Sequence, residues 1–293
     1  LTIVGIERNG KRVKCRYTEL TPAEKEAKKF DIIQLGYSPS EPGWWNAMWC
    51  YWFGGKLWDG DRKVTVNSPE NLEALRWFQS YPKKFGLDNM LTFGSSFGNF
   101  SSPQNPFLAN SVAMILQGVW MYNFIDKYNP GMEWDAAPFP SADPEKYPMV
   151  TIVESDILCI PKEARHPKEA FEFMAFVSSQ PEIEKLNLGQ RKLSPLMETS
   201  PGFIKNHPNP KIEMFIELAK SPNAFYVPKI QIWSEMTAEM SVAYDQAFRL
   251  LRTPEEALGE VQTRLQWRMD RLMRRWDKVC NERLKEWKAY DAR

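Results

Sequence analysis

The sequence has little of the chemistry that metal sites and nucleophilic catalysis require. Only two histidines occur, His166 and His207, each directly before a proline and without a cysteine or acid cluster at metal-ligand spacing. This pattern argues against a zinc site. The GxSxG, GxGxxG and GxxxxGK[ST] motifs are absent, so nucleophile-elbow, dinucleotide and P-loop functions lack support. We therefore expect no metal and no cofactor.

The sequence also lacks cysteine pairs, a long apolar run and a charge of one sign. The four cysteines stand far apart without a CxxC pair, which argues against a disulfide framework. No apolar run is long enough to cross a bilayer, and the start does not resemble a signal peptide. The 38 Lys+Arg and 37 Asp+Glu give a net charge of +1, so no global charge favours nucleic acid or an anionic membrane.

Tryptophan, by contrast, is abundant. The chain has 12 tryptophans in 293 residues, and four of them lie in the stretch 43–55, GWWNAMWCYWFGG: Trp44, Trp45, Trp49 and Trp52. Rings at this density suit a ligand with flat C–H faces and a rim of hydroxyls, which describes a sugar. The alternative is a buried helix that packs its tryptophans in the core.

Short apolar segments interspersed with helical patterns predict a mixed α/β fold. Asn9-Gly10 predicts a hairpin between residues 2–6 and 12–17, and a second hairpin is predicted at 56–66. Further strands are predicted at 32–37, 112–116, 134–140 and 157–160. Helices are predicted at 68–81, ending before Pro82, and then from 120 to 128, from 166, from 181 to 189, and at 211–220 and 233–252. Residues 86–106 and 190–210 are predicted to be loops.

The last helical region carries two distinct faces. Thr253 to Glu256 form a capping box with proline at the first helical position. An apolar stripe follows at three- and four-residue steps: Leu258, Val261, Leu265, Met269, Leu272, Trp276 and Val279. The opposite face carries six cations between Arg264 and Lys278. We expect a solvated basic face, with contact to a membrane or a partner as the alternative.

Three acidic residues could carry chemistry. Glu154 and Asp156 flank Ser155, and Glu41 precedes the aromatic stretch. A pair of carboxylates suffices for a glycosidase. The same groups could accept hydrogen bonds from sugar hydroxyls, or they could be ordinary surface carboxylates. The residues alone leave these alternatives open.

Several motifs occur in one consistent order along the chain. Residues 33–37 read IQLGY, and Gly54-Gly55 ends the aromatic stretch; residues 107–120 then resemble an FxxGxxAMxxxGxW signature. WDAAPFP follows at 134–140, IP at 160–161 and HP at 166–167. This ordered set, over about residues 30–265, resembles the extracellular solute-binding proteins of family 1, the sugar-binding subunits of ABC importers.

This resemblance implies a type II periplasmic-binding-protein fold of two α/β lobes joined by a hinge, which closes on a ligand in the cleft. It implies binding without a covalent step, so we expect no enzyme activity. The expected ligand is a di- or oligosaccharide, and the expected partners are ABC permease subunits, with no nucleic acid. The protein is expected to be a monomer outside the cytoplasmic membrane, in the periplasm or at the cell surface as a lipoprotein.

The resemblance also implies aromatic contacts with the ligand. Trp120 closes the signature at the position where the family places a stacking ring. Trp44 or Trp45 corresponds to a cleft aromatic when counted back from Gly54-Gly55, and Trp233 lies near another stacking position.

Polar ligand contacts are expected from four further residues. Counted back from Gly54-Gly55, Glu41 lies near the position of a cleft acid in the family. Glu154 and Asp156 occupy a hinge-proximal segment where many members have small residues, so two acids there are a departure from the family pattern. Arg191, after Gly189, is a further cleft candidate.

The resemblance covers mainly the C-terminal lobe. Residues 1–158 and 206–293 are assigned to that lobe, and residues 159–205 to a segment that returns to the N-terminal lobe. The signal peptide, lipobox cysteine and first lobe are missing, and Leu1 is not a natural initiator, so we expect a piece of a longer protein. If the chain were complete, the helices at 167–188 should expose an apolar face. A carbohydrate hydrolase using paired carboxylates is the alternative function, and a scaffold without a ligand is a third.

Overall fold

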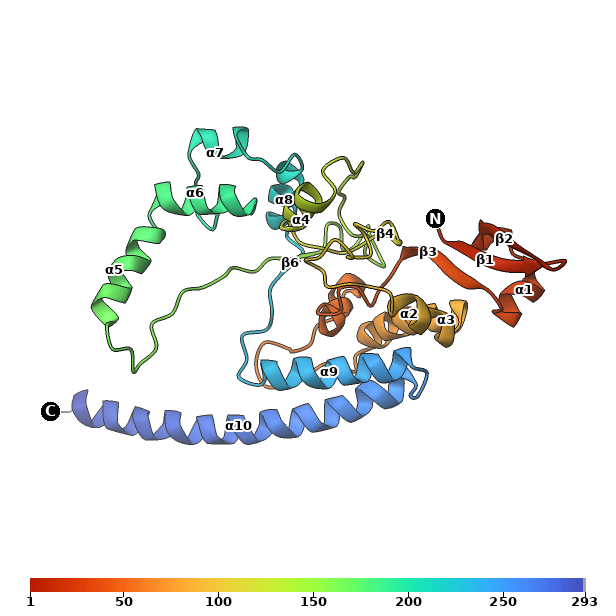
Figure 1. The fold of residues 1–293 in the computed structure, drawn as a ribbon. Coiled ribbons are helices and arrows are strands. Elements are labelled where there is room, and N and C mark those ends of the chain that lie inside the picture. The colour runs from red at the N-terminus through yellow and green to blue at the C-terminus, as the bar shows by residue number, and fades with distance from the viewer. Residues whose placement is uncertain (292–293) are drawn as a thin grey trace. The chain divides into compact units, whose positions relative to one another are not determined.

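The computed structural model describes residues 1–291, which divide into two compact units. Unit 1 comprises residues 1–4, 33–42 and 95–226, and unit 2 comprises residues 5–32, 43–94 and the chain from 227 onward. Figure 1 shows the elements along the chain. This division does not follow the three predicted segments, whose assignment to lobes stays a prediction.

Unit 2 begins with the predicted hairpin. Strands β1 (Ile3–Arg8) and β2 (Lys11–Arg16) are joined by Asn9 and Gly10, whose φ angles of 53° and 70° suit a tight two-residue turn. Thr21 then caps α1 (Pro22–Ala27) through a capping box with Glu24. These strands belong to a four-stranded sheet with β3 (Asp31–Tyr37) and β4 (Val112–Met114), in the order β2-β1-β3-β4.

The core of unit 2 is built from the aromatic stretch and three long helices. The stretch forms a 3₁₀ helix, η2 (Asn46–Phe53), which packs against α2 (Pro69–Phe85) and α9 (Trp233–Phe248). Figure 1 shows that α10 (Pro254–Asp291) runs alongside α9 and extends past the end of α9 that begins with Trp233. Ser68 caps α2 by accepting a hydrogen bond from the Asn71 N–H, and the predicted capping box at Thr253 is present.

Two predictions for unit 2 were wrong. Pro82 does not end α2, which runs on to Phe85 and ends at Gly86, whose φ is 89°. Phe85 is buried and packs edge-on against Tyr17 at 4.8 Å, which offsets the hydrogen bond that the proline removes. Residues 87–94 form helix α3 (Leu87–Gly94) instead of a loop, because Met90 and Phe93 bury one helical face.

Unit 1 contains two short parallel pairings. Strand β3 (Asp31–Tyr37) pairs with β4 (Val112–Met114), with Leu35 opposite Val112, and β5 (Thr151–Ile152) pairs with β6 (Ala224–Phe225). The helices are α4 (Met121–Tyr128), α5 (Pro167–Val177), α6 (Gln180–Gln190), α7 (Pro201–Lys205) and α8 (Ile212–Ala219). Helices α4, α5, α6 and α8 confirm the predicted helices, and α5 begins at Pro167, one residue after the predicted start at 166.

Three predictions for unit 1 were wrong. Residues 134–140 and 157–160 are not strands, and α7 interrupts the predicted loop at 190–210. Ile157 and Leu158 are exposed, and no strand among the described residues pairs with this extended segment. An apolar run therefore stays irregular here because no neighbour supplies its backbone hydrogen bonds.

Candidate functional site

Trp120 stands at the start of α4 in unit 1. It is the N-cap residue, with φ −65° and ψ −15°, and its indole Nε1–H donates to Gln117 Oε1 at 3.1 Å. The half-buried ring lies over Gly118: a Cβ added to Gly118 would be 2.2 Å from Trp120 Cη2 and Cζ3. Only glycine at position 118 permits this ring position, which explains the Gly-Val-Trp order of the motif.

Helix α4 holds Trp120 on a packed base. Met121 and Ile125 are buried with Leu108 in a cluster that also includes partly buried rings such as Trp134. The Asn209 Nδ2–H donates to the Val119 carbonyl at 3.3 Å, which ties the residue before Trp120 to a distant loop. The backbone on both sides of Trp120 is therefore anchored.

The structure brings Arg191 to the same helix. Arg191 ends α6 with a left-handed φ of 57°, and its Nη2 donates to Asp126 Oδ2 at 2.6 Å. Its guanidinium Cζ lies 4.9 Å from the centre of the Tyr122 ring, and Tyr122 itself lies 5.6 Å from Trp134. Trp120 and Arg191 therefore both attach to α4, although 71 residues separate them in the chain.

Tyr122 and Trp134 were not among the predicted ligand contacts. Both are half-buried, in contact with each other and with the helix that Trp120 begins. Trp134 opens the WDAAPFP motif, and that motif was the only sequence signal that could have pointed to it.

Glu41, also in unit 1, lies in a partly buried position. Its backbone N–H donates to the carbonyl of the buried Ser38 at 3.3 Å, and its peptide bond to Pro42 is cis. Burial disfavours the charged carboxylate and raises the pKa of Glu41 to about 7. Near neutral pH this group can therefore both donate and accept a hydrogen bond.

Glu154 and Asp156 lie on the exposed extended segment that follows β5. Asp156 accepts a hydrogen bond from Lys192 Nζ at 2.9 Å and is otherwise open to solvent. Although the Glu154 side chain is exposed, neighbouring atoms desolvate its carboxyl and raise its pKa. Because one acid is paired with a lysine, the two carboxylates do not form an equivalent pair.

The aromatic stretch in unit 2 separates into one exposed ring and several core rings. Trp44 is 43% exposed, whereas Trp45 is 6% exposed and packs edge-on against it with ring centres 6.1 Å apart. Trp49 and Trp52 are fully buried, and Trp49 packs at 5.1 Å from Trp77. The core interpretation thus holds for most of the stretch, and Trp44 is the ring with a face open to solvent.

Trp233 is the first residue of α9 and is half-buried. Its backbone N–H donates to the Ile230 carbonyl at 3.2 Å, and the preceding Ile232 is buried. The helix start therefore fixes the position of its backbone.

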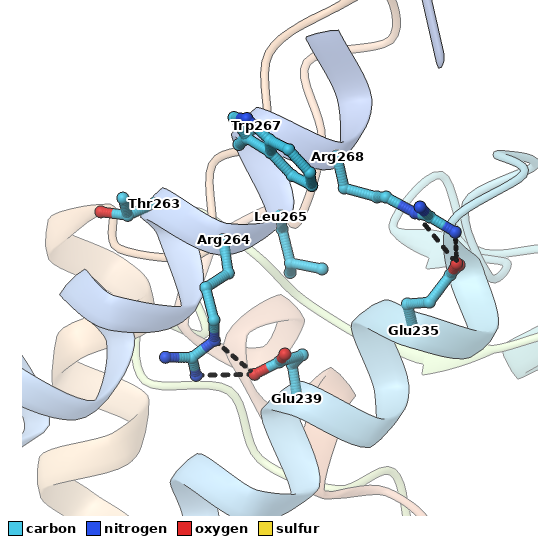
Figure 2. A pocket seen from close by; sticks show the side chains of 7 residues that line it. All are labelled: Glu235, Glu239, Thr263, Arg264, Leu265, Trp267 and Arg268. Atoms are coloured by element: carbon cyan, nitrogen blue, oxygen red, sulfur yellow. Dashed lines mark hydrogen bonds and ion pairs between the residues drawn. The ribbon is translucent and has the colours of Figure 1, made fainter. Parts of the chain in front are cut away.

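A hollow of about 480 Å³ lies between α9 and α10, within unit 2. Figure 2 shows that two ion pairs join the facing helices: Arg264 contacts Glu239 at 2.6 Å, and Arg268 contacts Glu235 at 3.0 Å. Trp267 lines one side. None of the predicted ligand residues lines this hollow, so it is distinct from the candidate site.

Among the side chains that the structure describes, no group of three or more His, Cys, Asp or Glu could hold a metal ion. No helix in this part of the chain is long and apolar enough to cross a membrane.

Solved structures share this fold. The structure of CpMnBP1 with mannobiose bound has a TM-score of 0.71 and 23% identity, over 89% of this chain and 68% of its own. The protein Lmo0181 from Listeria monocytogenes, in complex with cycloalternan, has a TM-score of 0.60 and 17% identity, over 93% and 69%. The sugar-binding protein MalE from Xanthomonas citri has a TM-score of 0.62 and 17% identity, over 84% and 60%. The mixed α/β fold is therefore that of periplasmic sugar-binding proteins, over about 60–70% of their length.

No curated protein sequence is significantly similar to this chain. The family of bacterial extracellular solute-binding proteins, in contrast, matches residues 18–182, which is more than half of the chain. This family binds solutes and is not enzymatic, which confirms the expected absence of catalysis and removes the hydrolase alternative. The match confirms the resemblance that the motifs indicated, and the chain belongs to the bacterial extracellular solute-binding proteins.

Proposed function

We propose that this protein is the solute receptor of an ABC importer and that its solute is a di- or oligosaccharide. The observation that carries this proposal is the family match, taken together with structural neighbours that hold mannobiose and cycloalternan. The aromatic residues add support, because indole rings with one open face suit the C–H faces of pyranose rings.

Trp120 and Trp44 are the proposed stacking residues. Trp120 is half-buried, anchored on α4 and held over Gly118, so its ring is preorganised and loses little freedom on binding. Trp44 offers the exposed ring of the aromatic stretch. Trp45 supports Trp44 from behind through the edge-on contact, and Trp233 is a further proposed ring contact.

Polar residues would set the orientation of the sugar. Glu41 is the proposed partner of a ligand hydroxyl, since a carboxyl group with a pKa of about 7 can donate or accept. Arg191 is proposed to act next to Trp120, from its position against Tyr122 and Asp126. Glu154 and Asp156 are proposed as outer contacts on the exposed segment.

The lobe assignment belongs to the same proposal. Helix α5 exposes Phe171, Phe173 and Phe176 to solvent, which is costly for an apolar face. We assign residues 159–205 to the N-terminal lobe of the two-lobe fold, where other parts of that fold would cover these rings. Closure of the lobes on the ligand would be the state that the permease recognises, outside the cytoplasmic membrane.

Calorimetry on the intact protein with mannobiose, maltose and a cyclic gluco-oligosaccharide tests this function. We expect heat of binding with at least one of these sugars and a strong loss of affinity in Trp120→Ala. Trp267→Ala is the matched control, because this exposed tryptophan lies outside the proposed contacts. Absence of binding across a broad glycan panel, or release of reducing ends from a bound oligosaccharide, would contradict the proposal.

A further inference from the structure

The apolar stripe of α10 has a packed part and an open part. Leu258, Val261, Leu265 and Met269 are all buried within unit 2. The next polar anchor is Asp277, which accepts two hydrogen bonds of 2.8 Å from the guanidinium of Arg62. From residue 278 to 287, every side chain that the structure describes is exposed.

The stripe nevertheless continues through the open part. Trp276 and Trp287 are 51% and 72% exposed, and Val279 and Leu284 are also exposed. At 3.6 residues per turn, Trp276 and Trp287 lie only about 20° apart around the helix. Figure 1 shows this end of α10 extending past α9, and both rings are more than half exposed to solvent.

The opposite side of the same segment is basic. Residues 271–291 contain seven Lys or Arg and four Asp or Glu, which gives a local net charge of +3 although the whole chain is nearly neutral. Arg274, Lys278 and Lys285 lie on the side of the helix opposite Trp276 and Trp287, by the same helical geometry. A cationic face opposite an apolar face with tryptophans is typical of helices that lie in a membrane interface.

We propose that the end of α10, residues 272–287, binds an anionic phospholipid surface. The apolar face enters the headgroup boundary, and the cations contact lipid phosphates. The alternative occupant, a second copy of this chain, is less well matched: helix pairs use a narrower seam, whereas this face spans Trp276, Val279 and Leu284 and would bring the Arg283 charges of both copies into the seam. Arg283 lies within the apolar face, where its long stem can extend the guanidinium toward the headgroups.

Flotation of the intact protein with vesicles tests this surface. Vesicles of phosphatidylcholine mixed with phosphatidylglycerol should carry the wild-type protein upward, and vesicles of phosphatidylcholine alone should carry much less. The double variant Trp276→Ser/Trp287→Ser should reduce partitioning on the order of tenfold or more. Arg274→Gln/Lys278→Gln/Lys285→Gln should remove the preference for phosphatidylglycerol, and added salt should weaken wild-type binding.

The matched control is Trp267→Ser. Trp267 is 57% exposed on the same helix, stacks under Arg271 at 4.9 Å and lies about 180° from Trp276. This variant should float like the wild type. The proposal is overturned if the wild type binds neither vesicle, or if the Trp267→Ser control loses as much binding as the double variant. It is also overturned if lipid-free ultracentrifugation shows dimers that disappear in Trp276→Ser/Trp287→Ser. Circular dichroism of each variant shows that the helix is retained.

Discussion

Gly118→Ala should displace the Trp120 ring without removing any aromatic side chain from the protein. The new Cβ would be 2.2 Å from Cη2 and Cζ3 of Trp120, whereas ordinary van der Waals contact begins at 3.4 Å. The ring must therefore move by at least 1.2 Å, the difference between these distances. That movement also strains the 3.1 Å hydrogen bond from Trp120 Nε1 to Gln117.

The expected loss follows from what the displaced ring no longer contacts. An aromatic contact contributes about 0.5–1.5 kcal/mol beyond area burial, and misplacing the ring also reduces the apolar area it covers. A total of about 1–2 kcal/mol corresponds to an affinity roughly 5- to 30-fold weaker. Calorimetry with the best-binding oligosaccharide measures this loss directly, and urea unfolding shows separately any cost to stability.

Gly131→Ala is the matched control. A Cβ at Gly131 meets no atom within 4 Å, so this variant should bind and unfold like the wild type. If Gly118→Ala binds the sugar with unchanged affinity while remaining folded, Trp120 is not a stacking residue and the geometric argument fails.

Three further predictions concern other parts of the chain. Trp44→Ala should weaken sugar binding with little effect on stability, whereas Trp45→Ala should cost about 3–5 kcal/mol of unfolding free energy because the Trp45 ring is buried. Equal stability of the two variants in urea unfolding would contradict this prediction. Burial raises the pKa of Glu41 from 4.5 to about 7, so the folded state keeps a proton that the unfolded state releases; stability should fall as pH rises through this window and stay flat above it. Glu41→Gln should remove that slope in unfolding measured from pH 4 to 8 (roughly the titration window), and an unchanged slope would refute the assignment. Thr253→Ala should lower the free energy of unfolding by about 1 kcal/mol through loss of the helix cap, while Thr263→Ala within the same helix should not lower it. Equal unfolding free energies for the two variants would contradict the capping role of Thr253.

Signals that act over a few residues allowed much of the fold to be predicted. The Asn9-Gly10 turn, the cap at Ser68 and the capping box at Thr253 each satisfy backbone groups within their own segment, so they could be identified without knowing the neighbours. The motif around Trp120 was equally local, since Gly118 and the start of α4 lie within four residues of each other. These features placed the helices and identified the family.

Tertiary packing decided what local patterns left open. Pro82 stays inside α2 because Phe85 gains a buried contact with Tyr17, far away in the chain. The residues at 157–160 are apolar but form no strand, because a strand requires a hydrogen-bonding neighbour.

The candidate site shows the same division. Composition alone showed that the stretch 43–55 is rich in tryptophan, but only the packing of η2 separates the exposed Trp44 from the buried Trp45, Trp49 and Trp52. Likewise, the proximity of Arg191 to the helix of Trp120 depends on the fold of unit 1. The sequence by itself determined the family and the local elements, because turns and caps are short-range interactions. Only the tertiary structure decided which rings remain exposed, because burial depends on residues that are distant in the chain.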